Sequence, residues 1–407
     1  MRNEAYSSVR RRSAPQQTGV FQQPAKDWRP SPQEQHMTTS ELKKFIQENC
    51  DDPAVGIASM DDFTPQEIKN MEQVNRSLAA YTPIMSADMP VLNPQEFMDG
   101  ARAIIMVGYN AFFGRNHELP GKAPHGEIIN AFVNQECIDY NAAQNEKIFS
   151  FLTEHGYSGL LMPAGIPQKI LAARSGLGQY GKNALIQAPE KGSWLSLYTI
   201  FTNAPLKPDT PITNQCEDCE ECKKACPTGA INEPYICDIE RCLTMQAMYN
   251  KGSIPLELRE KMGDCIAECC ICMDACPQNK NLAPNTNVST PLHLVHPEIA
   301  PLVNMTDAEF EKLFGGSFFE FLIIEKKYLQ RNAAIALGNH GDPDHVPVLI
   351  EALETQDDEL VRGAAAWALG KIATPDAQAA LEKFLTQDTS ESVRSEIQGA
   401  LDRLQTQ

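Results

Sequence analysis

The placement of the cysteines constrains this chain more than any other feature. Eleven of its 13 cysteines lie between Cys216 and Cys276, and only Cys50 and Cys137 lie outside that stretch of a 407-residue chain. A secreted disulfide framework distributes its pairs through a small fold, whereas a tight group of cysteines in a long chain is typical of metal ligands. We therefore expect a metal-binding segment and a reducing compartment, the cytoplasm.

The spacing of these cysteines indicates iron–sulfur clusters. Residues 216–227 follow the pattern C-x2-C-x2-C-x3-C-P, and residues 269–277 repeat its last three cysteines and the proline. In two-cluster ferredoxins the cysteine before the proline ligates the other cluster. The expected ligands of two 4Fe-4S clusters are Cys216, Cys219, Cys222 and Cys276 for cluster one, and Cys226, Cys242, Cys269 and Cys272 for cluster two.

Two zinc sites are the alternative, because zinc also takes paired C-x2-C ligands. The C-x3-C-P endings are not needed for zinc and favour iron–sulfur clusters. Cys237, Cys265 and Cys270 are then left over, and we expect them to be small buried side chains. Because neighbouring clusters move single electrons, they imply a redox partner or a second cofactor in the same chain.

The remaining sequence divides into regions of different character. Residues 1–36 form a Pro- and Gln-rich tail, in which Arg10-Arg11-Arg12 is not followed by the apolar stretch of an export signal. Helical patterns at 40–48 and 138–155 alternate with short apolar runs at 54–58, 103–107, 159–162 and 193–201, which predicts an α/β domain over 37–212. A ferredoxin-like double-cluster domain over 213–290 and a helical connector over 291–327 follow it.

The C-terminal region contains an internal repeat. The segment that begins at Arg331 recurs at Arg362, and a third copy begins at Arg394. Offsets of 31 and 32 residues, with small residues at matching positions, predict a HEAT-like α-solenoid over 328–407. A plain helical bundle is the alternative interpretation.

The overall charge of the chain bears on its partners. Lys and Arg number 35 against 53 Asp and Glu, for a net charge of −18 and a pI near 4.9. This balance disfavours a protein that holds nucleic acid mainly by neutralising phosphates. No run of about 18 apolar residues occurs, so no membrane-spanning helix is expected.

One motif, with the cysteines, carries a family resemblance. Residues 172–183 read AARSGLGQYGKN and are followed by Gly192-Ser193-Trp194, by IFTNAPL at 200–206 and by the cysteine-rich region. This order resembles the epoxyqueuosine reductase family, cobalamin-dependent iron–sulfur enzymes related to the reductive dehalogenases. The resemblance is strong over 165–280, extends to the terminal repeats and is weak over 1–160.

The resemblance implies a corrinoid-binding first domain and a reductase of the tRNA queuosine pathway. Electrons would pass from an external donor such as ferredoxin or flavodoxin through two 4Fe-4S clusters to cobalamin and then to substrate. The chain lacks the Asp-x-His-x-x-Gly motif, so we expect the cobalamin to bind base-off. The implied cofactor-binding residues are Arg174, Gly176, Gly178, Gly181, Lys182, Asn183 and Thr244. The three glycines also suit a simple turn between helix and strand.

The sequence departs from the family at the proton donor. In the family an aspartate lies ten residues before the AAR motif, and this chain has Met162 there. Methionine cannot donate a proton, so another residue must do so or the substrate differs. Tyr180 and Lys182 are the candidate catalytic donors, because a tyrosine assisted by a Lys or Arg, here Lys182 or Arg174, protonates the substrate in the dehalogenase relatives. Tyr109, Tyr140 and His125 are the other candidates.

A second departure concerns tRNA. Residues 328–407 contain 13 acidic and 6 basic side chains, although this region helps hold the anticodon arm in the tRNA-modifying relatives. The charge disfavours tRNA as a partner. We therefore expect a corrinoid- and iron–sulfur-dependent reductase, and the sequence does not identify its substrate. The alternatives are a dehalogenase-like reductase of a small organic substrate and a two-cluster electron-transfer protein with a repeat docking domain.

Overall fold

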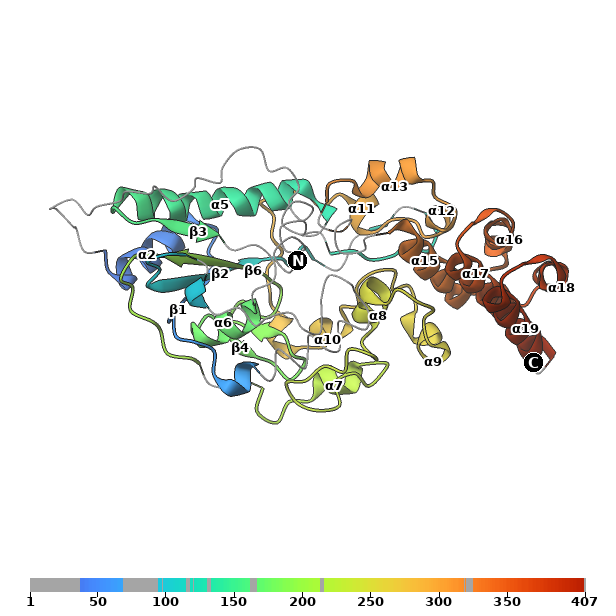
Figure 1. The fold of residues 1–407 in the computed structure, drawn as a ribbon, viewed down its shortest axis with the longest axis horizontal. Helices are drawn as coiled ribbons and strands as arrows, with labels where there is room; N and C mark the ends of the chain where they lie inside the picture. The colour runs from blue at the N-terminus through green and yellow to red at the C-terminus, as the bar shows by residue number, and fades with distance from the viewer. Residues whose placement is uncertain are drawn as a thin grey trace, which may run out of the picture.

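The computed structural model describes residues 37–68, 94–96, 98–114, 118–119, 121–129, 133–161, 167–212, 216–317, 319 and 325–405. The tail expected at 1–36 and the donor position Met162 lie outside these residues. The molecule is elongated, with a sheet domain at one end, the cysteine-rich region in the middle and the repeats at the other end (Figure 1). Within the described residues no helix is long and apolar enough to cross a membrane.

An antiparallel sheet forms the centre of the first domain. Its strands are β1 (Ala54–Ala58), β2 (Ala103–Asn110), β6 (Leu195–Thr202) and β3 (Gly159–Leu161), in that order across the sheet. All three pairings are antiparallel. The four strands match the four apolar runs of the sequence. Alternation of helix and strand is more typical of a parallel sheet, so the direction of pairing is new information from the tertiary structure.

Helices cover both faces of this sheet. On one face, α2 (Thr39–Asn49) and α5 (Gln135–Glu154) pack against Ile105 and Val107 of β2. On the other face, α6 (Gln168–Arg174) and the hairpin β4 (Gln179–Tyr180)–β5 (Ile186–Gln187) pack against Ile104 and Met106. Burial on both faces explains why β1 and most of β2 are apolar without polar alternation. A short 3-10 helix, η1 (Pro94–Glu96), completes the domain.

The cysteine-rich region contains only short helices. They are α7 (Glu221–Ala225), α8 (Leu243–Tyr249), α9 (Leu256–Arg259), η2 (Glu260–Met262), α10 (Ile271–Asp274) and η3 (Pro277–Asn279). The described residues of the connector include α11 (Leu292–Val295), α12 (Ala300–Val303) and α13 (Asp307–Phe314).

The repeats form a stack of longer helices. These are α15 (Lys326–His340), η4 (Pro343–His345), α16 (Val346–Thr355), α17 (Glu359–Ile372), α18 (Pro375–Gln387) and α19 (Glu391–Gln405). Small residues allow close approach: a Cβ on Gly338 would lie 2.8 Å from Cα of Ala368, and one on Gly370 would lie 2.5 Å from Cβ of Ala400. The close contacts recur with the period of the sequence repeat.

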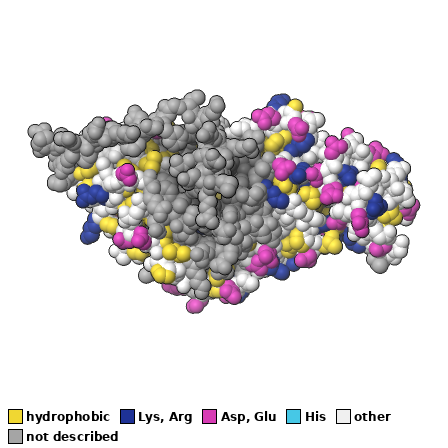
Figure 2. Space-filling model, in the orientation of Figure 1, with side chains coloured by type: hydrophobic (Ala, Val, Ile, Leu, Met, Phe, Trp, Pro, Cys, Tyr) yellow, Lys and Arg dark blue, Asp and Glu magenta, His cyan; other side chains and the backbone are white. Residues whose placement is uncertain are grey.

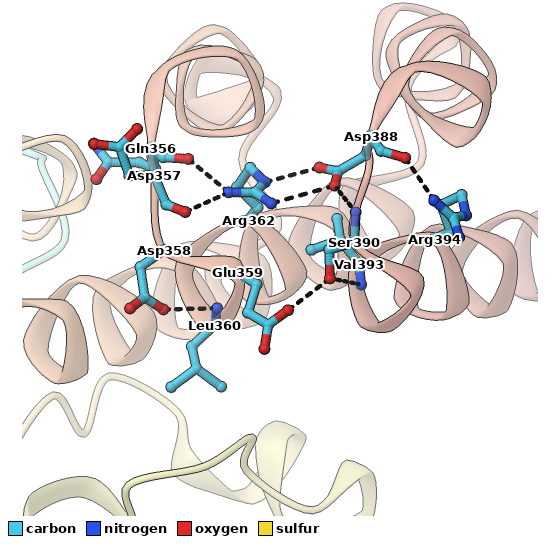
Figure 3. A network of polar contacts seen from close by, with 10 residues as sticks. All are labelled: Gln356, Asp357, Asp358, Glu359, Leu360, Arg362, Asp388, Ser390, Val393 and Arg394. Carbon is cyan, nitrogen blue, oxygen red and sulfur yellow. Dashed lines mark hydrogen bonds and ion pairs between the residues drawn. The ribbon is translucent and has the colours of Figure 1, made fainter.

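Equivalent arginines connect the repeats. Arg362 pairs with the carboxylate of Asp388 at 2.7 Å and donates to the carbonyls of Gln356 and Asp357, while Arg394 donates to the carbonyl of Asp388 (Figure 3). These bonds hold each inter-helix turn against the next repeat. The repeated arginine in the sequence therefore has a structural role at the second and third copies.

The first arginine of the series joins the repeats to the cysteine-rich region. Arg331 is 1% exposed and donates to the carbonyls of Asn250 and Gly252, both at 2.6 Å. Its neighbour Asn332 donates to the carbonyls of Ala247 and Ile266. A continuous hydrophobic core runs from α8 through the connector into α19. The C-terminal end of α8 is thus fixed by the repeat stack.

Candidate metal and cofactor site

The cluster-one thiols lie together. Cys222 sits in the first turn of α7, and burial raises the pKa of its thiol. The neighbouring thiols of Cys276, Cys216 and Cys219 raise it further, because several negative charges cannot easily coexist there. The structure therefore brings together the four cysteines that the spacing assigned to cluster one.

The two Cys-Pro steps share one backbone conformation. Cys226 ends α7 with an extended backbone (φ −66°, ψ 113°), and Cys276 has nearly the same conformation (φ −73°, ψ 122°). The proline that follows each cysteine disfavours helical backbone at that cysteine, so the helix does not continue there. The exchange of these two ligands between the clusters stays a prediction.

The second group of thiols adjoins the first. The pKa of the Cys272 thiol is raised to about 12, mainly by burial. Repulsion from the nearby thiols of Cys242, Cys269, Cys222 and Cys226 adds to this shift. Cys222 belongs to the first set, so the two sets are neighbours. Cys242 precedes α8 with an extended backbone that directs its thiol toward the other cysteines rather than along the helix.

Cys237 belongs to this second group, contrary to the expectation that it is a spare, buried side chain. It is partly exposed, and its thiol donates a hydrogen bond to Cys242, which lowers the pKa of Cys242 to about 7. The same contact raises the pKa of Cys237. Cys265 and Cys270, by contrast, are buried as expected. Spacing alone carried no signal for Cys237, because it lies outside the C-x2-C pattern.

The motif at 172–183 forms the end of α6 and the β4–β5 hairpin beside the cysteines. Gly176 has φ +69°, and a Cβ there would meet the carbonyl oxygen of Thr210 at 2.6 Å. A Cβ on Gly178 would meet Ile186 at 2.6 Å, and one on Gly181 would meet Asn183 at 2.8 Å. Protein contacts thus account for all three glycines. Their part in cofactor binding stays a prediction.

The same hairpin holds buried amides without partners. Both polar side-chain atoms of Gln179 and the Nδ2 of Asn183 are buried and accept or donate no hydrogen bond within the described residues. Leaving such groups unpaired costs about 1–3 kcal/mol each. They are therefore the atoms of this motif that a polar ligand would satisfy.

Other motif residues make protein contacts. Arg174 pairs with Glu67 at 2.7 Å and donates to the carbonyl of Asp61, whereas Lys182 donates to the carbonyl of Glu217 at 2.7 Å. Tyr180 packs against the second face of the sheet, and burial raises its pKa to about 12, with a further contribution from Glu67. The structure does not bring Tyr180, Lys182 and Arg174 into one hydrogen-bonded group.

Thr244 and the remaining donor candidates also have structural partners. The Thr244 hydroxyl accepts a hydrogen bond from the backbone N–H of Cys269 at 2.9 Å, which ties α8 to the second cysteine set. Tyr109 is buried and donates to Asn145 at 2.9 Å. The backbone of His125 pairs with that of Glu298, and burial raises the pKa of Tyr140.

Lys169 is a site residue that the sequence did not single out. It lies in the first turn of α6, and its Nζ donates to the carbonyl of Ala184 at 3.1 Å. Desolvation by surrounding protein lowers the pKa of Lys169, whereas the nearby thiols of Cys237, Cys242 and Cys272 raise it. The side chain still reaches solvent. Lys169 therefore lies between the hairpin and the second cysteine set, where its side chain is accessible to solvent.

The hairpin and the β5–β6 turn dock directly on the cysteine-rich region. The Cys276 thiol lies 3.9 Å from Oε1 of Gln187. Asn279 accepts from the backbone N–H of Ser193 at 2.8 Å and donates to its hydroxyl, and Gly192 leaves the space that Asn279 occupies. The Gly-Ser pair of the sequence motif is therefore an inter-domain contact.

Comparisons with known proteins agree with this arrangement. Two family descriptions match: a 4Fe-4S double cluster binding domain over residues 215–279 and HEAT repeats over residues 322–402. An epoxyqueuosine reductase of Bacillus subtilis is 34% identical over 250 residues, 59% of this chain and 62% of that protein. One of Listeria monocytogenes is 32% identical over 269 residues, 64% of this chain and 70% of the relative.

A solved structure extends the likeness to most of the chain. An epoxyqueuosine reductase bound to an epoxyqueuosine-modified tRNA-Tyr stem loop superimposes with a TM-score of 0.79 at 28% identity, covering 90% of this chain and 98% of that one. The fold is thus common to both over most of their lengths. The chain belongs to the epoxyqueuosine reductase family.

Proposed function

We propose that this chain is a cobalamin-dependent reductase of the epoxyqueuosine reductase type, with two 4Fe-4S clusters. One observation carries the proposal: two adjoining groups of thiols lie against a hairpin in which both polar side-chain atoms of Gln179 and the Nδ2 of Asn183 are buried without partners among the described residues. A two-cluster electron-transfer protein would account for the thiols. It would not account for the unpaired amides of Gln179 and Asn183.

The residues of this site fit a corrinoid. Gln179 and Asn183 would pair with the carboxamide groups at the edge of the macrocycle, and Lys169 would lie between that edge and the second cysteine set. When bound, cobalamin supplies a reducible cobalt centre. Because Cys272 adjoins Cys222, electrons would cross from cluster one to cluster two without leaving the protein. An external donor such as ferredoxin or flavodoxin would supply these electrons to the clusters.

Cofactor analysis tests this proposal. Anaerobically reconstituted protein should contain about eight iron atoms per chain, four for each cluster. Added cob(II)alamin should bind base-off, with no nitrogen superhyperfine splitting in its paramagnetic resonance spectrum, and Gln179→Leu should weaken binding by about tenfold. Gln95→Leu, at an amide that bonds the carbonyl of Met60, is the control. Failure to bind cobalamin would favour the electron-transfer alternative, and stoichiometric zinc without iron would contradict the clusters.

Reduction of an epoxide to an alkene takes two electrons and two protons and releases water. A group that keeps its proton at neutral pH must supply the acid. Tyr180 is the candidate, because burial raises the pKa of its hydroxyl, which keeps its proton at neutral pH, and because it lies in strand β4 of the hairpin. We infer that Tyr180 is the donor that replaces the missing carboxyl group at Met162.

The charge of the repeats favours a substrate other than tRNA. Arg331 is buried, Arg362 pairs with Asp388, and Lys371 pairs with Glu260, so these cations are already engaged. Figure 2 shows acidic and basic side chains intermingled over the described part of the repeats, without a continuous basic surface on the face drawn. Each phosphate that a protein neutralises contributes about 0.7–0.9 to the slope of log binding constant against log salt concentration. Few of the described cations of the repeats are free to make such contacts.

The substrate can be tested with an epoxyqueuosine-modified tRNA stem loop. We expect weak binding and slow or absent conversion by the unmodified protein. Met162→Asp should raise conversion if the stem loop docks, and Met162→Leu is the size-matched control. No gain in Met162→Asp, with no measurable binding, would support a small organic substrate. Efficient turnover by the unmodified chain would show that tRNA is its substrate.

A further inference from the structure

Three potential metal ligands converge in the turn between α15 and α16, far from the cysteines along the chain. His340 ends α15, Asp342 precedes η4, and His345 ends η4. One ligating atom from each of these side chains lies within 4.8 Å of the other two. The group lies within the segment that the HEAT-repeat description matches.

The backbone of the turn holds the three positions in place. Gly341 ends α15 in the left-handed conformation (φ 73°, ψ 11°), which reverses the chain within one residue. Asp342 caps η4, and its Oδ1 accepts from the N–H of Asp344 at 3.0 Å. Pro343 follows at the first position of η4, where its fixed φ suits the turn. The cap uses one carboxylate oxygen of Asp342 and leaves the second for a ligand.

The imidazole rings of His340 and His345 lie close together. Their ring centroids are 5.9 Å apart in an edge-on arrangement. The Nε2 of His345 is buried and makes no hydrogen bond within the described residues.

We propose that His340, Asp342 and His345 form a binding site for a divalent late first-row transition metal such as zinc. Two imidazole nitrogens and one carboxylate oxygen are ligands that zinc takes, whereas magnesium and calcium prefer all-oxygen sites. Metal–ligand bonds of about 2.0–2.2 Å require only small rotations of side chains that start within 4.8 Å of one another. The ion would join the end of α15 to the start of α16 and keep one coordination position open to water.

Zinc titration of the full, cluster-loaded chain tests the site, because the eight cluster cysteines are then occupied by iron. Calorimetry should detect one zinc ion bound per chain. X-ray absorption spectroscopy at the zinc edge should show nitrogen and oxygen ligands and no sulfur ligand. His345→Ala and Asp342→Asn should each lower the affinity more than about tenfold. Asp342→Asn keeps the capping oxygen and loses the charge, so it separates coordination from folding of the turn.

His293→Ala is the matched control, since His293 is an exposed histidine of the connector helix α11. It should bind zinc as the unmodified chain does. Sulfur in the zinc shell, or equal zinc affinity in the unmodified chain and the His340→Ala/His345→Ala double variant, would overturn the proposal. Because the readout is zinc binding, it is independent of cobalamin, of the clusters' redox chemistry and of the substrate.

Discussion

The cysteine-rich region and the repeat stack are held together by different means. Helices α7, α8 and α10 of the cysteine-rich region have 5, 7 and 4 residues, whereas α15, α17 and α19 of the repeats have 15, 14 and 15. Helices of four to seven residues are too short to be stable by themselves. The first region therefore depends on its ligands and its neighbours, and the second depends on apolar packing.

The largest effect should come from removing a cluster ligand. We expect Cys272→Ala to lose cluster two and to speed hydrogen exchange over residues 216–280 by about 100-fold, because ligand binding supplies much of the local folding free energy. Exchange in α17 and α19 should change little. The matched control is Cys270→Ala, a buried cysteine two residues away, which should keep about eight iron atoms. If Cys272→Ala sped hydrogen exchange equally in residues 216–280 and in α17 and α19, the two regions would not be stabilised by different means.

The contact between the two regions gives the next effect. Arg331→Ala removes a buried guanidinium, leaves the buried carbonyl of Asn250 without that donor and should cost about 3–5 kcal/mol of unfolding free energy. It should also loosen α8 and lower iron retention. Arg362→Ala, the equivalent change one repeat later, should cost about 1–2 kcal/mol and leave the iron content unchanged. Chemical denaturation and iron analysis of the two variants measure the difference.

Packing of the repeats should respond to a single methyl group. In Gly370→Ala the new Cβ would lie 2.5 Å from Cβ of Ala400, and overpacking should cost about 1–3 kcal/mol. Gly363→Ala, on the same helix, has its nearest contact at 3.4 Å, to the flexible Glu396 side chain. It should be neutral or stabilising by up to about 1 kcal/mol. Denaturation followed by the emission of Trp367 tests both, and equal stability would contradict the packing argument.

The smallest effect concerns pH. Burial by itself would raise the pKa of Asp388, but hydrogen bonds from Arg362 and from the N–H of Ser390 lower it below its usual value (Figure 3). Its ionised form therefore stabilises the repeats above about pH 4, and that contribution is lost as the pH falls through the lowered pKa. Asp388→Asn should reduce stability by about 1 kcal/mol at pH 7 and by less at pH 3. An equal loss at both pH values would show that the charge does not matter.

The site was partly predictable from the sequence. Cysteine spacing is a local property, because a ligand loop is set by a few residues, so a double-cluster region could be predicted from spacing, although Cys237 beside Cys242 could not. The repeats could be recognised because each copy carries the same small residues and the same arginine. The antiparallel pairing of β2 with β1 and β6 could not be predicted, since residues buried on both faces lose the alternation that distinguishes the arrangements.

Tertiary structure alone decided which groups meet. Lys169 comes near the thiols of Cys237 and Cys242 because the fold brings the cysteine-rich region back to α6, and no sequence spacing encodes that proximity. The repeated arginines make the same point. Sequence determined that Arg331, Arg362 and Arg394 occupy equivalent positions, and the fold gave the first a different partner. As the first repeat has no repeat before it, Arg331 turns to the carbonyls of the cysteine-rich region, because a buried guanidinium must find acceptors wherever the chain places them.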